Sequence, residues 1–135
     1  MKLWQGIVIH HSASPDVSAN VIDDWHKERG WKEIGYHFVI REDGSLEPAR
    51  SFEDAGAHAL GRNSTHLGVC LTGHLGEHPP TVSQRATLLS LVKGLMSRYD
   101  IPWDKVERHH EQCPGYHFEW DTFVETLKEL NIDND

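Results

Sequence analysis

The chain has 135 residues, which is near the usual size of one domain, so we expect a single domain over residues 1–135. Its formal charge is −8, with 21 acidic against 13 basic residues and no Lys/Arg cluster, which argues against nucleic acid as a partner. No apolar run approaches the roughly 18 residues of a membrane span, so we expect a protein that does not insert into membranes. We also expect a monomer.

The N-terminal residues pass straight into a strand-like run. They lack the long apolar stretch and the cleavage site of a secretory signal, so the chain is expected to be cytoplasmic as synthesised, or to have lost its signal. Residues 6–9 form a short, mostly β-branched run bounded by glycine, which predicts a buried strand. That strand leads directly into His10 and His11.

The remaining elements alternate between helices and strands. The sequence predicts helices over residues 19–29, from 81 or 83 to about 99, and 121–130, and strands over residues 36–40, 45–48, 67–71 and 105–108. Alternation along the second strand predicts that Tyr36, Phe38 and Ile40 share one face. The continuous apolar run at 67–71 favours a central place in the sheet. The fold class is therefore α/β, with a central mixed sheet flanked by helices.

Eleven histidines are far more than a chain of this length usually carries, which indicates metal or proton chemistry. His109 and His110 stand just before Cys113, and imidazole and thiolate are preferred zinc ligands. A third ligand could come from His10 or His11 at the end of the first strand. Two histidines and one cysteine would leave the fourth tetrahedral position open, as in a catalytic zinc site. Cys70 lies in an apolar run and is expected in the core.

Several stretches occur together in an order that resembles a known family. They are Ile7-Val8-Ile9-His10-His11-Ser12-Ala13, Trp25-His26-Lys27-Glu28-Arg29-Gly30-Trp31, Gly35-Tyr36-His37-Phe38-Val39-Ile40, Asp43-Gly44, Gly56-Ala57-His58, Asn63, Leu67-Gly68-Val69-Cys70-Leu71-Thr72-Gly73, and His109-His110-Glu111 followed by Cys113-Pro114. The sequence resembles the type 2 N-acetylmuramoyl-L-alanine amidases. This family includes animal peptidoglycan recognition proteins and amidase-type phage lysozymes, and the resemblance covers nearly the whole chain.

The resemblance implies roles for individual residues. The zinc ligands would be His10, His109 and Cys113, with His110 as the rival for the second ligand. Tyr36 would be the catalytic residue beside the zinc-bound water. Three further residues would contact substrate, namely His58, Asn63 and His110.

The resemblance also implies an activity for the single domain over residues 1–135. It would be a zinc-dependent hydrolase that cleaves the amide between N-acetylmuramic acid and L-alanine in bacterial peptidoglycan. A phage-type endolysin that acts on the cell wall after release would fit. One alternative is a non-catalytic peptidoglycan-binding recognition protein, but such proteins commonly lack the cysteine ligand. Another is an interaction protein in which zinc is only structural.

One departure from the family lies before Cys113. Only His110, Glu111 and Gln112 separate His109 from the cysteine, whereas the family usually has a longer segment with a residue that steadies the oxyanion. The short spacing predicts a tight turn. Zinc alone, or His110, His58 or Gln112, would then have to stabilise the developing charge.

Overall fold

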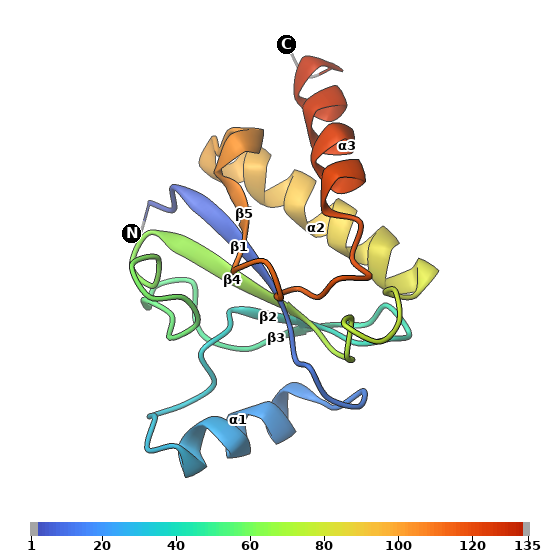
Figure 1. Ribbon diagram of the computed structural model, residues 1–135. Helices are drawn as coiled ribbons and strands as arrows, with labels where there is room; N and C mark the ends of the chain where they lie inside the picture. Colours follow the sequence, from blue (N-terminus) through green and yellow to red (C-terminus); the bar gives the residue numbers. More distant parts are fainter. Residues whose placement is uncertain (1–2, 134–135) are drawn as a thin grey trace.

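A mixed five-stranded sheet lies at the centre of the fold in the computed structural model, which describes residues 3–133 (Figure 1). The strands are β1 (Gly6–His11), β2 (Phe38–Ile40), β3 (Leu46–Pro48), β4 (His66–Leu71) and β5 (Val106–Arg108), in the spatial order β3-β2-β4-β1-β5. Only the β2–β3 hairpin is antiparallel. The predicted α/β class, the mixed sheet and the central place of the 67–71 strand are confirmed.

Helices cover both faces of the sheet. Helix α1 (Ala19–Glu28) lies on one side, whereas α2 (Val82–Tyr99) and α3 (Trp120–Asp133) lie on the other (Figure 1). A short 3-10 helix, η1 (Trp103–Lys105), precedes β5. Every residue of β1 and β4 is buried, because a strand covered on both faces has no solvent side. None of the helices in residues 3–133 is long and apolar enough to cross a bilayer.

The two faces of the sheet carry cores of different size. The larger core joins Ile9 and Val69 to α2 and α3, and the smaller one joins Val39 to Ile22 of α1. Since side chains alternate along β1, His10 points away from the face that Ile9 occupies. The end of β1 therefore delivers a histidine to the α1 side of the sheet.

The predicted shared face of Tyr36, Phe38 and Ile40 is wrong for Tyr36. Phe38 and Ile40 belong to the larger core, but Tyr36 packs against the smaller one. The reason is that β2 begins only at Phe38, so the strand alternation does not extend back to Tyr36. Tyr36 thereby lies on the same side of the sheet as His10, with ring centroids 5.0 Å apart.

Gln84 joins the start of α2 to the ends of two strands. It is fully buried, and its Nε2 donates to the carbonyl oxygens of Ile40 (3.2 Å) and Thr72 (2.8 Å). Its Oε1 accepts from the Thr81 amide (3.1 Å), and the Thr81 hydroxyl accepts from the Gln84 amide (3.0 Å), which forms a capping box. Of the two predicted helix starts, 81 and 83, the structure shows the first, with Thr81 as the N-cap fixed to the strand ends.

Replacing Gln84 by Leu should lower the free energy of unfolding by about 1–3 kcal/mol, since the Thr72 carbonyl and Thr81 amide lose buried partners. Urea unfolding followed by circular dichroism measures the change. Lys93→Leu, on the exposed side of the same helix, is the control and should change stability by less than about 0.5 kcal/mol. Equal stability of the two variants would contradict this assignment.

Candidate metal centre

The sheet brings together two histidines that are far apart in the sequence. Strand β1 pairs in parallel with β5, so that Ile9 lies opposite Arg108. His109 follows β5 directly, and its amide donates to the Ile9 carbonyl oxygen at 3.3 Å. Because parallel strands end at the same edge, the rings of His10 and His109 come within 4.6 Å of each other, measured between centroids.

A tight turn then places Cys113 beside them. The His110 amide donates to the Cys113 carbonyl (3.1 Å), and the Cys113 amide donates to the His110 carbonyl (3.0 Å). The tight turn predicted from the short spacing is therefore confirmed. It brings Cys113 Sγ to 3.9 Å from His10 Nδ1.

The segment after Cys113 contains a glycine that lies close to the backbone of Leu75. Gly115 has φ 106°, and an added Cβ would overlap the backbone of Leu75. Only glycine fits this close approach without strain. The amide of His117 then donates to the Leu75 carbonyl at 2.7 Å, so the chain after Cys113 is fixed against the loop that follows β4.

The donor atoms fit a metal ion. In the part of the chain that the structure describes, His10, His109 and Cys113 form a group whose ligand atoms all lie within 4.8 Å of one another. Tetrahedral zinc, at about 2.0–2.1 Å from nitrogen and about 2.3 Å from sulfur, would place an N and an S ligand about 3.6 Å apart. The 3.9 Å between His10 Nδ1 and Cys113 Sγ is close to that value. His109, rather than His110, belongs to this group.

The protonation states of these groups follow from their surroundings. Burial, followed by the neighbouring imidazoles, lowers the pKa of His10 well below its usual value, and burial also lowers the pKa of His109. Both rings are therefore neutral at pH 7 and can act as ligands. Burial raises the pKa of the Cys113 thiol to about 11, although a hydrogen bond from the His11 amide opposes this. A bound cation would reverse that effect, because a coordinated thiol gives up its proton.

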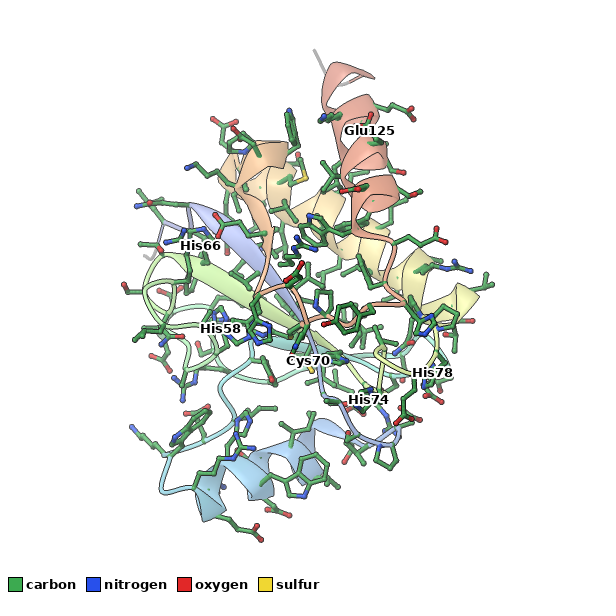
Figure 2. All side chains as sticks on the ribbon, viewed as in Figure 1. His58, His66, Cys70, His74, His78 and Glu125 are labelled. Carbon is green, nitrogen blue, oxygen red and sulfur yellow. The ribbon has the colours of Figure 1, made fainter. Side chains whose placement is uncertain are left out.

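These residues form part of a cleft of about 510 Å³. It is lined by His10, His11, Ala13, Tyr36, His74, Gly76, His109, His110, Gln112, Cys113 and Tyr116. Among the described residues, those that line it include no Lys, Arg, Asp or Glu. Figure 2 shows Cys70 and His74 towards the carboxyl end of β4, and His66 at the start of that strand. The cleft therefore opens at the carboxyl ends of the parallel strands.

Tyr36 lies in the wall of the cleft next to His10. Burial, and then the nearby thiols of Cys70 and Cys113, raise its pKa well above the usual value. The phenol is therefore neutral at pH 7 and is able to donate a hydrogen bond. Cys70, a residue of β4, is fully buried, as expected of a core residue.

The three residues expected to contact substrate lie in two different places. His110 is exposed in the cleft, and its Nδ1 accepts from the Gln112 amide at 3.2 Å. His58 is buried against His10, with 2.9 Å between His58 Nδ1 and His10 Nε2. Asn63 Oδ1 accepts from the amides of His58 (2.6 Å) and Ala59 (2.9 Å). The positions of His58 and Asn63 favour support of His10 over contact with substrate.

Three further residues line the cleft: His11, which the sequence offers as an alternative ligand to His10, and His74 and Tyr116, which it does not single out. His11 Nδ1 accepts from the Leu75 amide at 3.0 Å, and the His11 ring lies 5.5 Å from the His74 ring, between centroids. Tyr116 is exposed beside them. The pairing of His11 with His10 was a usable signal, but His74 and Tyr116 lie in irregular segments without any motif.

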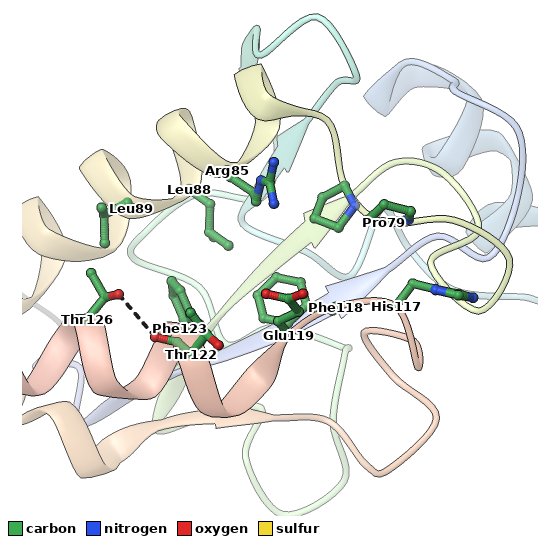
Figure 3. Close-up of a pocket in the computed structure, with 11 residues that line it drawn as sticks. Pro79, Arg85, Leu88, Leu89, His117, Phe118, Glu119, Thr122, Phe123 and Thr126 are labelled. Carbon is green, nitrogen blue, oxygen red and sulfur yellow. Dashed lines mark hydrogen bonds between the residues drawn. The ribbon is translucent and has the colours of Figure 1, made fainter.

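A separate apolar cavity of about 180 Å³ lies between α2 and α3 (Figure 3). Its walls include Leu88 and Leu89 of α2 and Phe123 of α3. None of the candidate ligands or substrate-contacting residues lines it. The candidate ligands therefore all lie in the histidine-lined cleft.

Comparison with known proteins shows the family to which the chain belongs. The family model described as N-acetylmuramoyl-L-alanine amidase matches residues 1–116. The endolysin of Escherichia phage T7 is 37% identical over 116 residues, which cover 80% of this chain and 76% of the endolysin. Peptidoglycan-recognition protein LB of Drosophila melanogaster is 34% identical over 124 residues, which cover 81% of this chain and 53% of that protein.

A solved structure gives the same result. The N-acetylmuramoyl-L-alanine amidase LysC from Clostridium intestinale URNW matches with a TM-score of 0.88 at 34% identity, over 94% of this chain and 87% of LysC. The chain belongs to the N-acetylmuramoyl-L-alanine amidase family. The family predicted from the ordered sequence motifs is confirmed.

Loss of an outer-shell partner weakens metal binding by up to about 100-fold, and loss of a direct ligand should weaken it more. Replacement of His109 by Ala should therefore lower the affinity for a divalent metal ion by more than about 100-fold. The same change at the neighbouring His110 should leave the affinity within a few-fold, because His110 is outside the ligand group. Competition of each folded variant with a chromogenic chelator measures the affinity. Equal losses in the two variants, or a loss at His110 alone, would contradict the geometry.

Proposed function

We propose that this chain is a zinc-dependent hydrolase that cleaves the amide between N-acetylmuramic acid and L-alanine in bacterial peptidoglycan. The observation that supports it most strongly is the group of His10, His109 and Cys113 in an open cleft. Two neutral imidazoles and one thiolate leave a divalent ion with net positive charge and an open position. Membership of the amidase family supplies the substrate.

Zinc bound there would polarise the scissile carbonyl and lower the pKa of a water molecule. The residues of the chain then have separate tasks. His10, fixed in the sheet, and Cys113, fixed by the tight turn, hold two of the ligand positions rigidly. The neutral Tyr36 phenol can donate a hydrogen bond to the attacking water or to the developing oxyanion.

His110 is the candidate for the support that the family's longer segment usually provides. Because its Nδ1 accepts from the Gln112 amide, a neutral His110 ring carries its proton on Nε2. That N–H belongs to an exposed ring in the cleft, where it can donate a hydrogen bond to the oxyanion. Since no Lys or Arg is among the described cleft residues, Tyr36 and His110 are the donors that we assign to this task.

Two other functions, a non-catalytic recognition protein and a protein with a structural zinc, predict different features of the site. A non-catalytic recognition protein would bind peptidoglycan without cleaving it and commonly lacks the cysteine, whereas Cys113 is present here with its sulfur within 4.8 Å of the donor nitrogens of His10 and His109. A purely structural zinc would be closed by a fourth protein ligand, whereas these three residues line an open cleft. Both features favour the enzyme.

The cellular role that we propose is that of an endolysin. Its support is the similarity to the endolysin of Escherichia phage T7, which spans most of both chains. The cleft lies within a single sheet and its loops, so the catalytic group requires no partner chain. As an endolysin, the protein would act on the cell wall after its release.

Zinc-loaded protein incubated with purified peptidoglycan should release stem peptides that begin with L-alanine, and a chelator should abolish the release. Detection of newly exposed N-terminal L-alanine measures it. Cys113→Ser should lose at least about 100-fold of the activity together with bound zinc. Cys70→Ser, at the other buried cysteine, is the matched control and should retain zinc.

Circular dichroism of the chelated protein distinguishes a catalytic zinc from a purely structural zinc. The chelated protein should remain folded, because a chain of 135 residues buries enough surface to fold without a metal. Unfolding on chelation would favour the structural zinc. A folded, zinc-loaded protein that binds peptidoglycan without releasing peptides would refute the hydrolase.

A further inference from the structure

The ring of His58 forms a hydrogen bond with Nε2 of His10, whereas the other ring nitrogen of His10, Nδ1, faces Cys113. His10 Nε2 lies 2.9 Å from His58 Nδ1, whereas His10 Nδ1 lies 3.9 Å from Cys113 Sγ. The other ring nitrogen of His58, Nε2, lies 2.9 Å from the carbonyl oxygen of His66. His10 and His58 are both buried. The two rings therefore form a hydrogen-bonded chain, sheltered from water, that runs from a backbone carbonyl to His10.

The direction of this chain can be deduced by counting protons. A carbonyl oxygen only accepts, so the Nε2–H of His58 must donate to His66. Nδ1 of the neutral His58 ring is then unprotonated and accepts from the Nε2–H of His10. The single proton of the neutral His10 ring is thereby used, and its Nδ1 carries a lone pair that faces Cys113. A metal ion binds imidazole through such a lone pair.

We infer that His58 is a positioning residue that holds His10 in the tautomer whose Nδ1 can bind the metal ion. This inference rests on the metal-dependent function proposed above. A ligating histidine usually donates its second N–H to a carboxylate, a backbone carbonyl or water. Here a neutral imidazole takes that place, so the partner adds no negative charge that would offset the positive charge of a bound ion.

The surroundings of His58 fix its ring in place. A Cβ added to Gly68 of β4 would lie 2.6 Å from His58 Cγ, and one added to Gly56 would overlap His58 Cδ2. Both positions therefore leave space that the imidazole fills. Asn63 holds the loop through the amides of His58 and Ala59. The ring is thus constrained by packing as well as by its two hydrogen bonds.

The tautomer can be measured directly in the unmodified protein. In the metal-free protein labelled with ¹⁵N-histidine, long-range nitrogen–proton NMR correlations should show the protons of His10 and His58 on Nε2. This experiment needs neither a variant nor peptidoglycan. A proton on Nδ1 of His10 would overturn the inference.

Variants test whether the hydrogen bond matters for binding. His58→Leu should weaken zinc binding by about 10–100-fold, the range for loss of an outer-shell partner, and should raise the share of His10 protonated on Nδ1. His58→Gln should restore most of the affinity, since its amide can accept from His10 and donate to His66. Gly68→Ala should weaken zinc binding in the same direction, because it displaces the ring while leaving His58 in place.

His37 offers a matched control. It is fully buried beside His58, with 5.9 Å between ring centroids, and its ring bonds to the Asp54 carbonyl (2.9 Å) and the Gly68 amide (3.0 Å). His37→Leu should destabilise the fold while changing the zinc affinity of the folded protein less than His58→Leu does. Equal affinity losses in the two variants, or none in His58→Leu, would overturn the inference. Zinc affinity that depends on His58 in a protein that cleaves no peptidoglycan would refute only the proposed function.

Discussion

The parallel pairing of β1 with β4 and β5 is the constraint on which the site depends. It brings the carboxyl ends of β1 and β5 to one edge of the sheet, so that His10 and His109 meet although they are far apart in the sequence. Because both faces of β1 are covered, His10 is buried and its orientation is fixed by the sheet. The cleft, the ligand geometry and the neutral state of the two imidazoles all follow from this arrangement.

The short segment before Cys113 and the histidine behind His10 complete this arrangement. The His110–Cys113 turn brings the thiol to the sheet edge without the longer loop that the family usually has. On the other side of His10, the His58 ring occupies the space above Gly68 and takes the second N–H. The three proposed ligands are thus held from both sides, whereas the residues left exposed in the cleft, such as His110, are available to substrate.

Much of the fold could be predicted from the sequence, because helices and strands follow local patterns. The sequence motifs also gave His10, His109 and Cys113 as candidate ligands, and the structure brings these three together through strand pairing. Apolar periodicity marked the elements, and motif order favoured His109 over His110. The orientation of Tyr36 was not predictable, since it depends on β2 beginning at Phe38. The place of His58 was not predictable either, because its loop has no periodicity and is fixed by tertiary contacts with Asn63 and Gly68. Packing across the sheet, rather than local sequence, decides such positions.

The proposed zinc site, with two histidines, one cysteine and one open position, is the central point to test. X-ray absorption at the zinc edge of the loaded protein tests it most directly. The account predicts one sulfur at about 2.3 Å and three nitrogen or oxygen atoms at about 2.0–2.1 Å, two of them from imidazole rings. A zinc shell without sulfur, or with sulfur from both Cys70 and Cys113, would contradict it.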